Sequence, residues 1–155
     1  MRLHASSALA RSHDPKAIDA LIAAMPADRL AVDALGESRS PRAVSPLIAF
    51  VQNAANKTED RAAAATSLGK LGDPRAVEPL IASLNEDNGA ITMQASSALG
   101  YLKDKRAVEP LKQAYARWNS RPYENAGSVT VFILAALQQL GSTELMRRVT
   151  GSPVK

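Results

Sequence analysis

One segment, repeated with variations along the chain, constrains the fold more than any other feature of the sequence. Its clearest copy is DRAAAATSLGKLGDPRAVEPLIASL, residues 60–84. It predicts an alanine-rich helix that ends at Leu68 and Gly69, with the glycine closing the helix in the left-handed conformation. A second helix is predicted to start after Asp73, the N-cap, and Pro74. It carries one apolar stripe, which a lone pair of helices could not bury.

The pattern occurs five times in all, so neighbouring copies can bury each other's stripes. Each copy has an anchor leucine in the first helix, and successive anchors lie 26, 33, 31 and 38 residues apart. This range is typical of helical solenoids. The sequence therefore predicts an all-α fold, a right-handed α-solenoid of about five two-helix repeats. The anchors are Leu9, Leu35, Leu68, Leu99 and Leu137, and the expected caps of the second helices are Asp14, Ser40, Asp73, Asp104 and Ser142.

The predicted repeats cover residues of about 2–25, 28–54, 59–86, 90–119 and 128–150, and together form one domain over 1–155. Because the chain starts inside a repeat, it is either a piece of a longer solenoid or has an end face that meets a partner. Pro46, Pro79 and Pro110 fall at the sixth position of their second helices. We expect each to remove one backbone hydrogen bond and to bend its helix.

Three segments resemble the HEAT-like repeats of the phycobilisome lyase type: LGKLGDPRAVEPLIASL, LGESRSPRAVSPLIAF and LGYLKDKRAVEPLKQA. The resemblance covers about residues 2–150 and implies a HEAT-like, armadillo-type superhelix. That repeat family includes bilin lyases, regulatory subunits and scaffold proteins, so the resemblance does not assign a role. The last copy, QLGSTELMRRV, departs most, because it lacks the proline and the Ala-Val pair.

Residues for catalysis, cofactor binding or metal binding are not evident. The chain has no cysteine, and its two histidines, His4 and His13, stand apart from each other and from acidic clusters. A relative of this fold resembling deoxyhypusine hydroxylase holds two irons with His-Glu pairs, and this sequence has no such dipeptide. We therefore expect no catalytic, cofactor or metal site and no cofactor, while a lyase-type enzyme subunit stays open as an alternative.

The net charge of +4 raises the question of nucleic acid. The position after the proline is basic in four copies, which predicts a basic column on the second helices. Three residues later most copies carry an acid, and we expect these pairs at i and i+3, or pairs between repeats, to neutralise the column. Nucleic-acid binding is therefore disfavoured. The basic residues are Lys16, Arg42, Arg75 and Arg106, and the residues three positions later are Asp19, Ser45, Glu78 and Glu109.

Aromatic residues gather in the segment YARWNSRPYENAG, residues 115–127, which includes the end of the helix predicted to reach residue 119 and the irregular loop expected after it. Tyr115 and Trp118 could pack the loop onto the stack, contact a partner or stack on a ligand. The helix that follows lacks a polar face, because Phe132 stands where an earlier copy has Gln94. The loop, a second chain or a missing repeat would then have to cover it.

We interpret the chain as a noncatalytic scaffold that binds another protein, or a second copy of itself, on the surface formed by the second helices. The alternatives are a bilin lyase-like or other enzyme-associated subunit that holds a ligand on the concave face, and a nucleic-acid binder. No apolar run reaches the roughly 20 residues that span a bilayer. We therefore expect no membrane contact and, unless the chain is a piece of a longer protein, a cytoplasmic location. The candidate partner-binding residues are Arg42, Arg75, Glu78, Arg106, Glu109, Tyr115, Trp118 and Phe132.

Overall fold

The computed structural model describes residues 14–142 and residue 147. Within residues 14–142 every regular element is helical, and a short 3₁₀ turn precedes three of the second helices. The helices predicted near 2–11 and after residue 142 lie outside the described residues. The α-helices are α2 (Pro15–Ala24), α3 (Arg29–Glu37), α4 (Val44–Gln52), α5 (Thr58–Leu71), α6 (Val77–Ser83), α7 (Gly89–Leu102), α8 (Val108–Asn119) and α9 (Tyr123–Gln139), and the 3₁₀ turns are η1 (Pro41–Ala43), η2 (Pro74–Ala76) and η3 (Lys105–Ala107).

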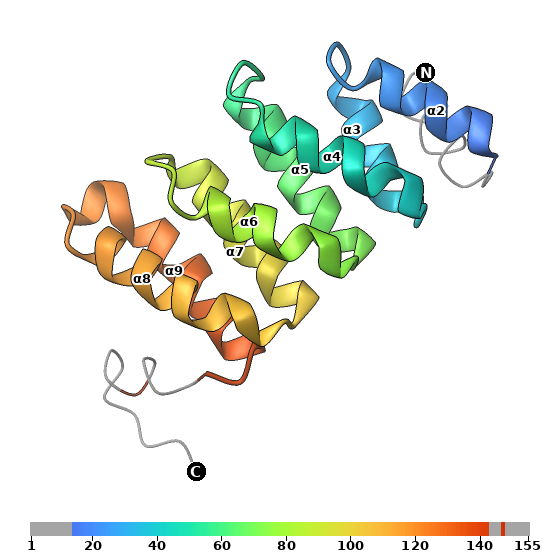
Figure 1. The fold of residues 1–155 in the computed structure, drawn as a ribbon. Coiled ribbons are helices and arrows are strands. Elements are labelled where there is room, and N and C mark those ends of the chain that lie inside the picture. The colour runs from blue at the N-terminus through green and yellow to red at the C-terminus, as the bar shows by residue number, and fades with distance from the viewer. Residues whose placement is uncertain (1–13, 143–146, 148–155) are drawn as a thin grey trace.

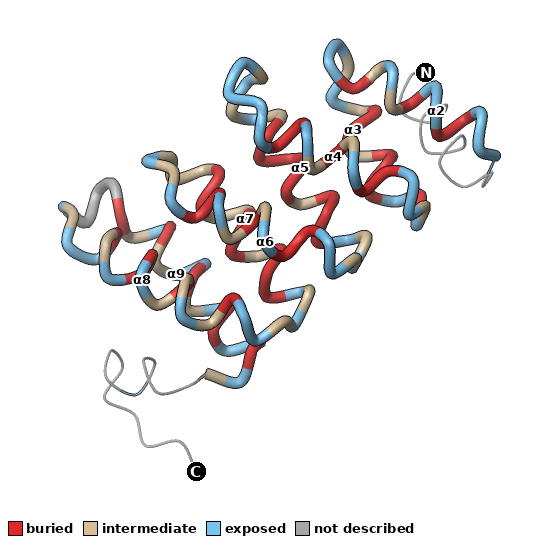
Figure 2. The backbone as a smooth tube through the Cα atoms, viewed as in Figure 1, coloured by how far each residue is buried: buried red, intermediate tan, exposed pale blue. Residues whose placement is uncertain are grey.

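The helices stand side by side in two layers (Figure 1). The first helices, α3, α5, α7 and α9, pack closely against one another, and each second helix packs against the first helix that follows it. Buried residues gather where the layers meet, and the outer sides of the second helices are exposed (Figure 2). The predicted all-α solenoid is confirmed.

The anchor leucines are the centre of each repeat's core. Leu35, Leu68, Leu99 and Leu137 are all fully buried, at 0% exposure. Valine and leucine from the second helices pack against them in one continuous cluster. Because each leucine is covered by helices from its own and the neighbouring copies, apolar burial stabilises the row as a whole.

The helix end predicted at Gly69 was wrong. Helix α5 continues to Leu71, and Gly72, with φ of 70°, is the residue that closes it in the left-handed conformation. Gly69 instead lies where α5 crosses α7. A Cβ atom on Gly69 would stand 2.8 Å from the Cα atom of Ala98, so this glycine permits the close approach of the two helices.

The same contact occurs at the neighbouring crossings. A Cβ on Gly36 of α3 would stand 2.8 Å from the Cα of Ser67 on α5, and one on Gly100 of α7 would stand 3.2 Å from the Cα of Ala136 on α9. Each glycine directly follows an anchor leucine. In α9 the residue directly after the anchor leucine is Gln138, and its side chain is exposed. The repeated glycines therefore set the spacing of the first-helix layer.

The corners are capped as predicted in three copies. The side chains of Asp14, Asp73 and Asp104 accept the backbone N–H two residues ahead, at N···O distances of 2.9–3.0 Å. Ser40 makes no such bond, which corrects the prediction. Its own N–H donates to Ser38 Oγ at 3.2 Å, and this hydroxyl donates to the Leu35 carbonyl. The residues that Ser142 would cap lie outside the described residues.

The three prolines do not interrupt their helices in mid-course, which corrects our expectation. Because α4, α6 and α8 begin only after a 3₁₀ turn, Pro46, Pro79 and Pro110 are the third residues of their α-helices. The N–H groups of a first turn have no intrahelical acceptor, so a proline there removes no helical hydrogen bond.

Helix α8 ends at Asn119, as predicted for the fourth repeat. The irregular loop expected after it is shorter than predicted, because α9 begins at Tyr123 and only residues 120–122 connect the two helices. Among the described residues, no helix is long and apolar enough to cross a membrane.

Candidate functional site

The outer side of the second helices presents the same three positions in four copies, and we call it the second-helix face. Counted from the first residue of each second-helix segment, these positions are the second, the fifth and the ninth. All twelve side chains are exposed. They are basic Lys16, Arg42, Arg75 and Arg106, then Asp19, Ser45, Glu78 and Glu109, then Ala23, Ala49, Ala82 and Gln113.

Ion pairs on this face connect neighbouring copies. Arg42 Nη2 lies 2.8 Å from Asp19 Oδ1 on the preceding copy, and Arg106 Nη1 lies 2.9 Å from Glu78 Oε1. Neither Arg75 nor Arg106 pairs with the glutamate three residues ahead in its own copy, so that part of the prediction was wrong. An arginine at the start of a second helix instead reaches the copy before it.

Arg75 shows what sets this pattern. The preceding copy offers Ser45 instead of an acid, and Arg75 donates to the backbone carbonyl of Pro41 at 3.2 Å. At the other end of the described row, Glu109 accepts from Lys112 Nζ at 2.8 Å, three residues ahead in its own helix. The inter-repeat bonds therefore follow the order of the copies.

The cap carboxylates form a second set of partners. Arg75 Nη2 lies 2.8 Å from Asp73 Oδ2, and Arg106 Nη2 lies 2.7 Å from Asp104 Oδ2. These side-chain hydrogen bonds, helped by the arginine's backbone N–H, hold the pKa of each aspartate below its ordinary value. The same bonds raise the pKa of both guanidinium groups. Each arginine is therefore held out from the corner in a defined position.

These ion pairs have a small energy of their own. The side chains of Arg42, Asp19, Arg106 and Glu78 are all more than half exposed, and exposed pairs contribute about 0–1 kcal/mol. A partner that offers its own charges can therefore exchange with them at little cost. A phosphate backbone would need unpaired cations, and the three arginines of this face all have acceptors within the chain.

Tyr115 and Trp118 lie in the core, which corrects their assignment to a partner surface. Their exposed fractions are 8% and 3%, and both belong to the hydrophobic cluster. Phe132 is partly exposed on α9, next to exposed Val131. These two leave an apolar patch at the end of the described stack. Tyr101, exposed at the end of α7, was not singled out from the sequence, which carries no signal for it.

Sequence reasoning also missed a buried arginine directly before the alanine run of α5. Arg61 is 6% exposed, donates from Nε to the Val51 carbonyl at 2.6 Å, and pairs through Nη2 with Glu86 at 2.6 Å. It thereby connects the end of α4 to the link before α7. The sequence carries little signal for this, because Arg61 stands beside two other charged residues, Glu59 and Asp60, at the start of the helix. We assign Arg61 a role in stability and not in partner binding, because both of its partners belong to this chain.

Hollows occur on both layers. One of about 320 Å³ lies over the first helices α3, α5 and α7 and is floored by Ala62 and Ala63, with Asp33 and Glu59 at its sides. Another of about 370 Å³ lies between α8 and α9 and includes Val131. Among the described residues, no three histidine or acidic side chains are arranged to hold a metal ion.

Comparison with known proteins agrees with the repeat architecture. The family of HEAT repeats matches residues 26–95 and 53–126. A solved structure titled the complex of CpcE and CpcF of phycocyanin lyase from Nostoc sp. PCC7120 is similar to 86% of this chain, with 28% identity and a TM-score of 0.71. This chain spans 56% of the matched chain. No curated protein sequence matches. Matches over more than half of its length show that the chain belongs to the HEAT-repeat family.

Proposed function

We propose that this protein is a noncatalytic HEAT-repeat scaffold that binds a partner protein on the second-helix face. The observation that carries the proposal is the register of that face: the second, fifth and ninth positions are exposed in all four second helices. A row of this kind offers a repeated basic, acidic and small residue at regular spacing. Such a surface suits a rigid partner that contacts several repeats at once.

The chemistry of the face supports polar recognition. Arg42, Arg75 and Arg106 are oriented by their neighbours and remain exposed. Exposed Ala49 and Ala82 leave room beside the charges for a partner's backbone or larger side chains. The similar solved structure is itself a complex of two polypeptides, CpcE and CpcF. We take the partner to be another protein or a second copy of this chain.

Site-specific photo-crosslinking tests the proposal. A photoreactive amino acid placed at Ala49, Ala82 or Gln113 samples the second-helix face, and one at Glu59 on the exposed side of α5 is the matched control. We expect one protein to be captured from all three second-helix positions and not from the control. The affinity of the captured protein for this chain, measured with purified components, should fall at least tenfold in the double variant Arg75→Glu/Arg106→Glu. Both substituted arginines have exposed side chains. Equal capture at Glu59, or unchanged affinity of the double variant, would refute the assignment of this face.

A second candidate is a lyase-like, enzyme-associated subunit that holds a tetrapyrrole. Only the structural likeness to the phycocyanin lyase complex favours it, and the hollow over α3, α5 and α7 is a place of suitable size for part of such a ligand. Adding bilin to the purified chain and recording its absorbance tests this alternative. A saturable spectral shift that Ala63→Trp abolishes would support it, since the new indole would fill the hollow; an unshifted spectrum would exclude it.

A further inference from the structure

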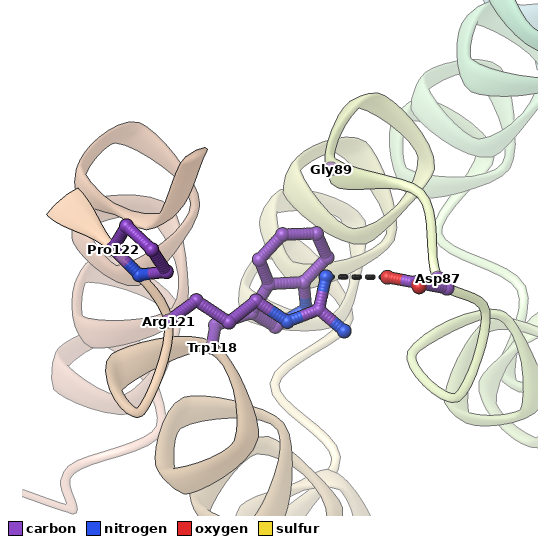
Figure 3. Close-up of a pocket in the computed structure, with 5 residues that line it drawn as sticks. All are labelled: Asp87, Gly89, Trp118, Arg121 and Pro122. Atoms are coloured by element: carbon purple, nitrogen blue, oxygen red, sulfur yellow. Dashed lines mark hydrogen bonds and ion pairs between the residues drawn. The ribbon is translucent and has the colours of Figure 1, made fainter. Parts of the chain in front are cut away.

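A pocket separate from the second-helix face lies near the end of α6 that is opposite its 3₁₀ turn. It is bounded by the link that precedes α7 and by the corner that joins α8 to α9. Its lining residues are Asp87, Gly89, Trp118, Arg121 and Pro122, and its volume is about 320 Å³ (Figure 3). The indole of Trp118 lies beneath the Arg121 side chain, with Gly89 above and Asp87 across the gap (Figure 3). The guanidinium carbon of Arg121 lies 4.2 Å from the centre of the indole ring.

Trp118 carries an unusual unpaired group into this pocket. Trp118 is only 3% exposed, yet its Nε1–H has no hydrogen-bond acceptor among the side chains and backbone groups that the structure describes. An indole nitrogen can only donate. Buried donors are nearly always paired, because an unmet donor loses its hydration without compensation. An acceptor that enters the pocket can supply the missing hydrogen bond.

The surroundings favour a negatively charged acceptor. Arg121 adds a guanidinium group, and Gly89 begins α7, a helix of 14 residues whose first N–H groups point toward its N-terminal end. Asn88 caps only the N–H of Ile91, two residues further along. A Cβ on Gly89 would lie 3.6 Å from Cη2 on the carbon edge of the indole, so the start of α7 lies beside the ring. Arg121 and the start of α7 therefore both favour negative charge in this pocket.

Asp87 already occupies part of this field. Its carboxylate pairs with Arg121, but the aspartate side chain is 77% exposed and belongs to the short link between α6 and α7. It does not bond to the indole N–H. An exposed ion pair of this kind is weak and exchangeable, so an external carboxylate can displace Asp87 from Arg121 and also accept from Trp118.

We propose that this pocket binds a carboxylate of an acidic peptide segment, with Trp118 Nε1–H and the Arg121 guanidinium as donors and Asp87 as the group that it displaces. The inference deepens the proposed scaffold function, on which it rests for the nature of the partner, by adding an anchoring site for an acidic residue or a free C-terminus. No covalent bond is made or broken, and the site needs no cofactor.

The test uses the fact that Trp118 is the single tryptophan of the chain. Its indole N–H gives one resonance in a nitrogen-proton correlation spectrum. The probes are acetyl-Gly-Glu-Gly-amide, acetyl-Gly-Gly-Gly with a free carboxylate, and acetyl-Gly-Gln-Gly-amide as the uncharged control. We expect saturable shifts of this resonance with carboxylate peptides at concentrations up to about 10 mM and none with the glutamine peptide. A shift with only one of the first two identifies the source as a side chain or a C-terminus.

Two single variants sharpen the result. Asp87→Asn removes the competing carboxylate and should tighten binding about threefold or more, whereas Arg121→Gln should weaken it about tenfold. Glu37→Gln, which changes an exposed acid at the end of α3, is the matched control and should leave peptide binding unchanged. No shift with any peptide, an equal shift with the glutamine peptide, or weaker binding by Asp87→Asn would overturn the inference. The photo-crosslinks at Ala49, Ala82 and Gln113 are independent of this pocket, so the two proposals can fail separately.

Discussion

Replacing Gly69 by alanine tests the account of how the first helices are spaced. Gly69 lies in the last turns of α5 and faces α7. A new Cβ would stand 2.8 Å from the Cα and 2.9 Å from the Cβ of Ala98. Neither of these atoms is the free end of a flexible side chain, so α5 and α7 must move apart to relieve the contact.

Two opposing effects decide the sign. Alanine in a helix interior is about 0.5–1 kcal/mol more favourable than glycine, which by itself would stabilise the variant. Overpacking of a close contact costs about 1–3 kcal/mol, and at Gly69 the contact is with backbone. We expect the packing term to be larger, so that the free energy of unfolding falls by about 1–2 kcal/mol.

The equivalent positions supply graded controls. In Gly100→Ala the nearest atom is the tip of the Gln139 side chain, which can rotate away, and the Cα of Ala136 is at 3.2 Å. The free energy of unfolding should therefore fall less in Gly100→Ala than in Gly69→Ala. Gln138→Ala, on α9, changes a side chain that is exposed, and should stay within about 0.5 kcal/mol of the parent.

Urea denaturation followed by far-ultraviolet circular dichroism measures the three variants, with the slope of unfolding recorded for each, because repeat arrays can lose two-state behaviour. The expected order of destabilisation is Gly69→Ala, then Gly100→Ala, then Gln138→Ala. A Gly69→Ala protein more stable than the parent would refute the reasoning, since helix propensity would then outweigh the contact between α5 and α7.

Three further predictions follow from the corners and the buried arginine. Pro79→Ala should change the free energy of unfolding by less than about 1 kcal/mol in a urea titration, whereas a proline in mid-helix would make the same change stabilising by about 3 kcal/mol. Arg61→Ala should cost about 2–3 kcal/mol, more than Glu86→Gln, because Arg61 is buried and its Nε bond to the Val51 carbonyl is lost as well; an equal loss in the two variants would contradict this role. Carboxyl resonances should show that Asp73 titrates below the ordinary pKa of an aspartate and that Arg75→Met returns it toward 3.8. Because the pKa of Asp73 is lower in the folded state, the stability that this carboxylate adds is present above the unfolded pKa and is lost as pH falls through the folded pKa. An unchanged Asp73 titration in Arg75→Met would show that Arg75 does not lower this pKa.

The row of repeats could be predicted from the sequence because its determinants are local. The helix around each anchor leucine and the caps at Asp73 and Asp104 depend on neighbours within a few positions. Burial of a stripe on every helix then requires the copies to stack. The exposed second-helix positions follow from the same periodicity, so Arg42 and Glu78 could be placed on the surface in advance.

What the sequence could not decide are the contacts between copies. Whether Gly69 closes a helix or admits a neighbouring backbone depends on the position of Ala98 on another helix. Arg106 has an acid three residues ahead in its own copy, yet its Nη1 lies 2.9 Å from Glu78 of the copy before it, a contact that only the stacking of the two copies creates. Trp118 is likewise buried by a link and a corner that are distant from each other in sequence.

Local propensity and hydrophobic period are written in each repeat, so they are readable before folding. The distance between two helices, the choice among several acceptors, and the enclosure of an indole depend on atoms that only the stacked chain brings together. This is the physical reason that the repeat architecture could be predicted from the sequence alone, while the positions of Gly69, Arg106 and Trp118 required the tertiary structure.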